Sequence, residues 1–446
     1  MKTLILELQE QNKKLQQQIT SLQEQVELLK NGRKSKTSST PPSHDYSRSN
    51  QRSLRKQSNR KTGGQIGHEG TTLHMKEIPD EIVEYRPDYC NQCGAILNSE
   101  EYKMVSRKQE IVLPPVVPKY IEHRSYTCTC GVCGGITTGE SPEYLKANVQ
   151  YGPPIAALVG YLSVRQYLPY KRIAEFMNSF FTLPISEGTI DNMIAGLTRK
   201  AEPIYREIKS RVEQSSVVGG DETGIKINGK KAWLWTFQTQ FLTFLVASMT
   251  RGYETISNVF QNGFPISVYV SDCLPAQLKI QTLAKQICIS HLLRELNNFI
   301  DVFNCGWSEK LKQLFQEAIL LKSELHPDDY LSPNEKVNSI RKRLDRLLDE
   351  PSFDKHKKVQ TFIKRLNKHN GSILTFLYHQ KVPPDNNGSE RSIRNAKVKM
   401  KVSGGFKSYE GAYRFAVLRS YIDTTVKNSQ DVFNALCLLA MSPAAE

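Results

Sequence analysis

Apolar residues recur at alternating intervals of three and four positions along the first 30 residues. The series consists of Ile5, Leu8, Asn12, Leu15, Ile19, Leu22, Val26 and Leu29, in which only Asn12 is polar. This heptad spacing predicts a coiled coil over 1–30, and β-branched residues alternating with leucines favour two parallel strands. One amphipathic helix packed on its own domain is the alternative. The pattern therefore predicts a homodimer formed through an N-terminal coiled coil.

Between residues 215 and 303 the pattern changes to short apolar runs that are typical of strands. "SSVVGGDE", "GIKINGKKAWLWTFQT" and "FLTFLVASM" predict three antiparallel strands with a turn at Asn228-Gly229. Strands "ISVYVSD" and "KQICIS" then alternate with helices over 253–261, over 277–284 and from His291 onward. This order is that of a ribonuclease H-like core, an α/β fold with a mixed sheet and helices on both faces.

Helical spacing fills most of the remaining chain. The apolar spacing over 150–214 predicts helices. The stretch "ISEGTIDNMIAGL" is typical of a helix-turn-helix with Gly188 near the turn. Ordinary core packing explains these helices equally well. Two amphipathic segments, "WSEKLKQLFQEAILLKSEL" and "VNSIRKRLDRLLDE", predict a helical insertion over 304–380. The core is then expected to resume over 381–446, with a last catalytic helix and a C-terminal helix.

Residues 31–67 differ in composition from the rest, because they combine Ser, Thr, Asn and Pro with many basic residues and one acid, Asp45. Such a segment cannot bury enough apolar surface to fold alone, so we predict a flexible linker. The net charge of the whole chain is +15, which indicates a polyanionic partner such as DNA. A solvated linker is the alternative to one that contacts phosphates through Arg55, Lys56, Arg60 and Lys61.

The apolar pattern excludes a membrane protein. No apolar run approaches the roughly 18 residues that a membrane-spanning helix needs, and the N-terminus is polar where a signal peptide would be apolar. We therefore expect a cytoplasmic protein with no membrane partner.

Two C-x-x-C-G motifs, "CNQCGA" and "CGVCGG", cluster four of the nine cysteines. In a cytoplasmic chain such clustering favours a metal over disulfides, and four thiolates complete a tetrahedral zinc site. We predict a small zinc ribbon over 68–145 that holds a DNA-contacting surface in shape; a zinc without nucleic-acid contact is the alternative. Cys128 could replace Cys130 as a ligand. The predicted ligands of the structural Zn²⁺ are Cys90, Cys93, Cys130 and Cys133.

Carboxylates follow two of the predicted strands. The first strand is expected to end at Asp221, beside Glu222, and the fourth at Asp272, and in this topology those two strands are neighbours. Two carboxylates so close repel unless a cation lies between them, and hard oxygen ligands suit magnesium. "PPDNNGSERSIRNAKVKM" supplies a third acid, Glu390, on a helix capped by Ser389 or an asparagine; a solvated helix face is the alternative.

The sequence resembles the DDE transposases of the insertion sequence sixty-six family in several blocks. "GGQIGHEG" at 63–70 is similar to the glycine-rich motif that precedes the family's zinc-binding domain, and "DETG" with "KAWLW" matches its first catalytic block. "SDCLPAQ" holds the second aspartate but lacks a tyrosine that is common there. "CISHLLREL" resembles the C-x-x-H block, and "DNNGSERSIR" matches the block with the final glutamate.

The resemblance implies metal-dependent cleavage and strand transfer on DNA in a bacterial cytoplasm, with the protein associated with the nucleoid when bound. The substrates would be the inverted repeats at the element's ends and a target DNA, and small accessory proteins of the element are further partners. Two Mg²⁺ or Mn²⁺ ions would be held by Asp221, Asp272 and Glu390. The residues expected to contact DNA are His291, Arg294, Arg391, Arg394, Lys397 and Lys407.

Two other functions remain open from the sequence. One is a metal-dependent nuclease on the same core, which would cleave DNA without joining strands. The other is a transposase-derived DNA-binding protein without catalysis.

Overall fold

The computed structural model describes residues 10–12, 14–16, 18, 73–97, 102–114, 116–145, 147–349 and 356–443. Residues 10–12, 14–16 and 18 are helical; the remainder of the predicted coiled coil lies outside the described residues. The linker over 31–67, with Arg55, Lys56, Arg60 and Lys61, also lies outside them. The chain divides into two compact units, Ser47–Val117 and a larger one that combines Met1–Tyr46 with Pro118–Glu446.

The described part of the smaller unit is extended chain held by side chains. Lys76 receives a hydrogen bond from the Gln109 amide at its carbonyl and donates its own N–H to Gln109 Oε1, at 2.7 and 2.8 Å. The segment "IVLPPVVPKYIEHRSYTC", part of the predicted zinc ribbon, is also expected from its sequence to form short strands. This prediction is wrong for most of its described residues. Only β1 (Thr127–Thr129), in the larger unit, forms there, paired with β2 (Ile136–Thr138). Prolines such as Pro114 and Pro118 cannot donate to a ladder, which explains the difference.

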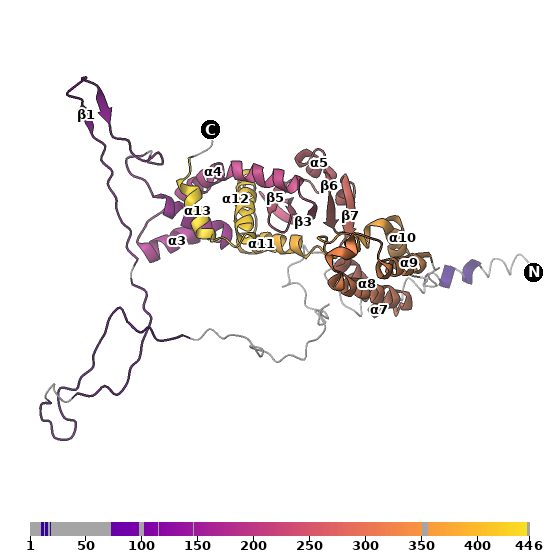
Figure 1. The fold of residues 1–446 in the computed structure, drawn as a ribbon, viewed down its shortest axis with the longest axis horizontal. Coiled ribbons are helices and arrows are strands. Elements are labelled where there is room, and N and C mark those ends of the chain that lie inside the picture. The colour runs from indigo at the N-terminus through magenta and orange to yellow at the C-terminus, as the bar shows by residue number, and fades with distance from the viewer. Residues whose placement is uncertain are drawn as a thin grey trace, which may run out of the picture. The chain divides into compact units, whose positions relative to one another are not determined.

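A five-stranded mixed sheet forms the centre of the larger unit (Figure 1). Its order is β5-β4-β3-β6-β7, with β3, β4 and β5 antiparallel and β6 and β7 parallel to β3. This order confirms that the first and fourth strands are neighbours. The strands are β3 (Val217–Ile227), β4 (Lys230–Gln238), β5 (Thr243–Ser248), β6 (Phe264–Ser271) and β7 (Thr282–Ile287).

The predicted turn at Asn228-Gly229 is confirmed, with φ of 48° and 72°, but two other boundaries were wrong. β3 does not end at Asp221, because the residues beyond it stay paired with β4 as far as Ile227. The pairing of β3 with β6 stops earlier, at Gly219. The helix predicted over 277–284 is a single turn, α6 (Pro275–Leu278), because 282–287 pair with β6 as strand β7.

Helices cover both faces of this sheet. On one face Tyr205 of α4 (Glu187–Glu213) stacks on Phe244, and Phe237 packs edge-on against Phe260, which follows α5 (Tyr253–Val259). On the other face lies α11 (Asn387–Ser403), against β3 and β4. The edge strand β5 is covered by α12 (Tyr409–Lys427), where the Ser420 hydroxyl accepts from the Leu245 N–H at 2.9 Å.

Within residues 147–216, directly before the sheet, the structure has three α-helices with a π-helical turn among them. They are α2 (Pro153–Gly160), the π-helix Tyr161–Arg165, α3 (Tyr170–Phe181) and α4. The turn predicted near Gly188 lies earlier, over 182–186, because Ser186 caps α4 through a 3.1 Å bond from the Thr189 N–H and Gly188 falls in the first helical turn. Thr182, with φ of 53°, ends α3. The C-terminal helix α13 (Val432–Met441) packs on α2.

The helices predicted between β7 and α11 are present and share a second hydrophobic core. α7 (Ile289–Phe303), α8 (Gly306–Glu324), α9 (Glu335–Asp349) and α10 (Lys357–Lys368) lie beyond β7 in Figure 1. Leu292, Phe315, Leu344 and Phe362 are buried there together with Val270 of β6. Within the described part of the chain, no helix combines the length and the apolar character that crossing a membrane requires.

Candidate active site

Asp221 and Asp272 occupy equivalent places on neighbouring parallel strands. The last residue pair between β3 and β6 is Gly219 with Val270, and each aspartate lies two residues further along the chain, Asp221 within β3 and Asp272 directly after the end of β6. Paired residues of parallel strands direct their side chains to the same face, since side chains alternate along a strand. The register therefore places both carboxylates on one face, where the two strands stop pairing.

The two glycines before Asp221 allow close packing on both faces of β3. A Cβ on Gly219 would lie 2.7 Å from Ser389 Oγ of α11, so this face carries the helix with Glu390. A Cβ on Gly220 would lie 1.7 Å from the Tyr269 hydroxyl on the opposite face. Any side chain at either position would push these partners away.

Asn386 joins the Glu390 helix to the Asp221 strand. It occupies the N-cap position of α11, but its side chain does not cap the helix. Instead its amide donates to the Gly220 carbonyl at 2.6 Å, and its Oδ1 accepts from Ser389 Oγ at 2.6 Å. Its backbone N–H donates to the Cys288 thiol sulfur at 3.2 Å, which anchors the same turn to the start of α7. The predicted side-chain cap from Ser389 or an asparagine does not form at Asn386, whose side-chain amide bonds to the sheet instead.

Glu390 contacts the two residues of the C-x-x-H block that the sequence singled out. Arg294 Nη2 donates to Glu390 Oε1 at 3.2 Å, and His291 Nε2 lies 3.8 Å from the same oxygen. Arg294 Nη1 and His291 Nε2 are 3.2 Å apart. α7 thereby presents one cationic and one imidazole group to the third acid.

The electrostatics of the site follow from burial and mutual repulsion. The Asp221 carboxyl has a pKa well above its usual value, first because it is buried and then because Glu222, Asp272 and Glu390 lie close by. Burial, followed by the Arg294 guanidinium, lowers the pKa of His291. The three predicted acids are therefore near enough to repel one another, which is the condition that a bound cation relieves.

The donor set fits divalent magnesium or manganese with an open coordination sphere. Among the described residues no three Asp, Glu, His or Cys side chains converge closely enough to enclose an ion. Magnesium commonly uses only one or two carboxylates and completes its octahedron with water and substrate phosphate oxygens. The repulsion at Asp221 and the hard oxygen donors of Asp272 and Glu390 fit such an open site.

The predicted DNA-contacting residues on and after α11 differ in accessibility. Arg391 and Arg394 are exposed, whereas Lys397 is half-buried. Lys407 is exposed and follows Phe406, whose N–H donates to the Lys226 carbonyl of the β3–β4 hairpin at 2.8 Å. Two guanidinium groups thus project outward from the helix that carries Glu390.

Each C-x-x-C-G motif folds by itself as a tight turn, called a knuckle here. In the first, the Cys90 N–H donates to the Ala95 carbonyl at 2.8 Å and the Cys90 carbonyl accepts from Gly94 at 2.9 Å. Cys130 makes the equivalent two bonds in the second, at the same distances. Gly94 and Gly134 have φ of 72° and 67°, the left-handed conformation that glycine permits.

The knuckle geometry distinguishes Cys130 from Cys128. Backbone N–H groups within the knuckles lower the pKa of Cys90 and Cys130. Cys128 instead lies in β1, paired with Thr137. The two knuckles belong to different compact units.

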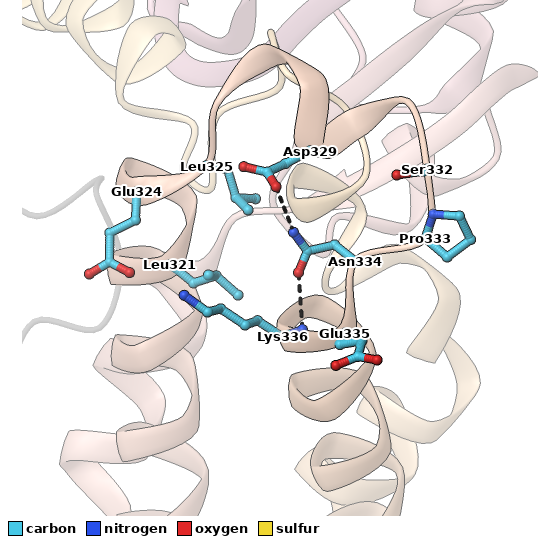
Figure 2. Close-up of a pocket in the computed structure, with 9 residues that line it drawn as sticks. All are labelled: Leu321, Glu324, Leu325, Asp329, Ser332, Pro333, Asn334, Glu335 and Lys336. Atoms are coloured by element: carbon cyan, nitrogen blue, oxygen red, sulfur yellow. Dashed lines mark hydrogen bonds between the residues drawn. The ribbon is translucent and has the colours of Figure 1, made fainter.

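One hollow of about 360 Å³ lies in the helical insertion, and its lining residues include none of the three acids (Figure 2). The Asn334 side chain makes two hydrogen bonds in this hollow. Its Oδ1 accepts from the Lys336 N–H at 3.0 Å, and its amide donates to Asp329 at 3.0 Å. These bonds join the 3-10 turn Pro327–Tyr330, which follows α8, to the start of α9. The hollow is thus a structural joint between two helices.

The sequence did not predict the partners of Glu222. Arg251 follows β5 and Gln277 lies in α6, and both donate to the Glu222 carboxylate. The adjacent acids of "DETG" were the available signal, but a strand sends neighbouring residues to opposite faces. The sequence alone could not identify what lies behind the sheet.

Comparison with known families gives the class of the protein first: it is a transposase, a DNA-processing enzyme. The chain belongs to the transposase IS66 family, whose profile matches residues 148–414, more than half of its length. Residues 1–74 match a family of unknown function, DUF6444. A search among curated proteins gave no match.

Proposed function

We propose that this chain cleaves DNA at the ends of an insertion sequence and joins them to a target, using Asp221, Asp272 and Glu390 as ligands of catalytic metal ions. The observation that carries the proposal is the register of β3 and β6, which brings the two aspartates together on the face that α11 covers. Family membership supports DNA transposition as the biological outcome.

The fold proposed for the core is ribonuclease H-like. Three antiparallel strands followed by two parallel ones, in the order β5-β4-β3-β6-β7, support this assignment. Helices on both faces and an insertion between β7 and α11 are compatible with it.

Two Mg²⁺ or Mn²⁺ ions, when bound, would activate water or the 3′ hydroxyl and stabilise the leaving oxygen. Asp221 and Asp272 would hold the first ion and Glu390 the second. Arg294 and His291 orient Glu390 in the protein alone and would contact the scissile phosphate with DNA bound. The exposed cations Arg391, Arg394 and Lys407, with Lys397, would bind the phosphate backbone and so position the strand.

The N-terminal part would supply DNA binding and assembly. A structural Zn²⁺ held by Cys90, Cys93, Cys130 and Cys133 is supported by the matching geometry of the two knuckles. The coiled coil would form a homodimer, and Arg55, Lys56, Arg60 and Lys61 would follow the phosphate backbone near the element's inverted repeats. Accessory proteins of the element would act alongside this assembly.

The test uses a plasmid that carries the DNA flanking the gene. Purified protein with Mg²⁺ is compared with Asp221→Asn and with the control Asp301→Asn, an exposed acid on α7. We expect breaks at defined ends and joined products from wild type and the control, and neither from Asp221→Asn. Breaks without joined products would favour a nuclease, and tight end binding without breaks would favour a non-catalytic descendant.

A further inference from the structure

Glu222 lies directly behind the acids, on the other face of β3. Gly219 and Asp221 face α11, so Gly220 and Glu222 face the side where Tyr269 packs. The Glu222 side chain is 2% exposed, although a buried carboxylate is costly unless it is paired. Its neighbours should therefore reveal what it does.

Both carboxylate oxygens of Glu222 are occupied. Arg251 donates from Nε and Nη2 to Oε1, at 3.0 and 2.6 Å, and Gln277 Nε2 donates to Oε2 at 2.7 Å. The Arg251 guanidinium also lies over the Trp233 ring, 4.7 Å from its centroid. Both oxygens of Glu222 are thus engaged by side chains, whereas among the described residues Asp221, Asp272 and Glu390 each accept at one oxygen.

Gln277 connects Glu222 to the second aspartate. Asp272 directly follows β6 in a tight turn, in which its Oδ1 accepts from the Leu274 N–H at 2.9 Å, and α6 with Gln277 begins immediately afterwards. The backbone pairing of β3 with β6 has already ended at Gly219 and Val270. The Glu222–Gln277 bond therefore joins β3 to the short helix that follows Asp272, beyond the last residue pair of β3 and β6.

The network retains polar atoms that packing alone does not require. The Tyr269 hydroxyl and Gln277 Oε1 are buried, and within the described residues neither has a hydrogen-bond partner. Unpaired buried polar atoms are costly and call for an explanation. Gln277 thus leaves its amide oxygen unpaired while its amide nitrogen bonds to Glu222. This cost is explained if the bond from Gln277 Nε2 to Glu222 has a role of its own.

We propose that Glu222 and Gln277 form a clamp behind the sheet that sets the separation of Asp221 and Asp272, and thereby the affinity of the site for divalent metal. Both are positioning residues, and Arg251 supplies the charge that lets Glu222 be buried. This inference rests on the proposed metal site. Residues that orient metal ligands from the outer shell typically change metal affinity by about 10- to 100-fold when replaced.

The test measures Mn²⁺ binding by isothermal titration calorimetry, without DNA, in the full-length protein. Gln277→Met keeps the side-chain volume but removes the amide, and Gln286→Met is the matched control. Gln286 is a buried glutamine of β7 that donates to the Ile373 carbonyl at 2.8 Å and has no bond to the acids. The Asp221→Asn variant lacks a proposed metal ligand, so it measures the Mn²⁺ that binds elsewhere in the chain.

We expect Gln277→Met to weaken Mn²⁺ binding by about tenfold or more, and to raise the Mg²⁺ concentration for half-maximal cleavage by the same factor. Gln286→Met should lower the melting temperature and leave Mn²⁺ affinity unchanged. Glu222→Gln, which keeps an acceptor oxygen, should lose less affinity than Glu222→Ala. Wild-type Mn²⁺ affinity in Gln277→Met would overturn the clamp. Equal Mn²⁺ binding by wild type and Asp221→Asn would instead overturn the metal site on which it rests.

Discussion

Asp221 and Asp272 stand opposite each other, each two residues beyond the pair Gly219 and Val270 that ends the parallel ladder between β3 and β6. Strands that stop pairing leave room between them, and here the Asn386 amide enters at the Gly220 carbonyl. The same small region thus receives two aspartates from the sheet and, through Asn386, the helix that carries Glu390. The arrangement produces an open acidic face instead of a closed cage.

The repulsion at this face should be measurable as stability. The pKa of Asp221 is higher in the folded protein than in the unfolded chain. As pH rises above about 4, the unfolded chain releases this proton first, so the free energy of unfolding falls. We predict that Asp221→Asn raises the melting temperature of the metal-free protein at pH 7. Mg²⁺ should raise the melting temperature of wild type but not of the variant.

Asp301→Asn serves as the control for this experiment, because the side chain is exposed and lies outside the acidic face. Its melting temperature should follow that of wild type with and without Mg²⁺. A wild-type response to Mg²⁺ in Asp221→Asn would show that the ion stabilises the protein elsewhere.

Gly220 should tolerate no side chain. A Cβ there would lie 1.7 Å from the Tyr269 hydroxyl, whereas a Cβ on Gly224 of the same strand finds its nearest neighbour, a Trp233 ring carbon, at 3.8 Å. Overpacking a buried position typically costs about 1–3 kcal/mol. We predict that Gly220→Ala lowers the free energy of unfolding by at least this amount and abolishes cleavage. Gly224→Ala should do neither; comparable losses in denaturant titrations would contradict the packing of β3.

Lys399 is a buried cation on the helix of Glu390. Burial lowers its pKa from 10.5 to about 8, and among the described residues no hydrogen bond or ion pair reaches its ammonium group. Between these two values the unfolded chain binds more protons than the folded one, so stability rises with pH across that window. We predict that Lys399→Met is more stable than wild type at pH 7, by about 1–3 kcal/mol.

The comparison variant for Lys399 is Lys401→Met, an exposed lysine of the same helix. Denaturant titrations at pH 7 and pH 9.5 should give a smaller pH dependence for Lys399→Met than for wild type, while Lys401→Met keeps the wild-type dependence. Identical pH dependence in all three proteins would show that Lys399 is solvated.

The two knuckles should share one zinc. Cys93→Ser and Cys133→Ser should each lower the zinc content of the purified protein and weaken binding to the element's ends. Cys128→Ser should retain zinc, because Cys128 lies in β1 and outside the knuckle turn. Elemental analysis of the purified variants measures their zinc content. Loss of zinc in Cys128→Ser, with retention in a Cys130→Ser variant, would show that Cys128 and not Cys130 is the ligand.

The sequence was most informative where local chemistry decides structure. The Asn228-Gly229 turn was predicted because both positions require positive φ, and the neighbouring strands β3 and β6 followed from the element order. The long amphipathic helices α8 and α9 were predicted from their periodicity. The turn and the two helices depend on residues close together in the chain, whereas the pairing of β3 with β6 was predicted from the order of the elements.

The end of β3, the extent of α6 and the partners of Glu222 depend on distant segments and could not be predicted. The helix expected over 277–284 was replaced by strand β7, because pairing with β6 outweighs the local preference. β3 continues past Asp221 because β4 remains its partner. The hydrogen bonds of Glu222 with Arg251 and Gln277 join three segments that only the folded sheet brings together.

The most direct test of the central claim replaces one oxygen ligand by sulfur. In Asp221→Cys the thiolate binds Mn²⁺ or Cd²⁺ more readily than Mg²⁺, since soft ligands prefer softer metals. The measurement is cleavage of DNA carrying the element's ends, in each metal, by wild type and by Asp221→Cys. We predict that the variant is inactive with Mg²⁺ and regains cleavage with Mn²⁺ or Cd²⁺. Cleavage with Mg²⁺ at the wild-type rate would contradict the assignment of Asp221 as a catalytic metal ligand.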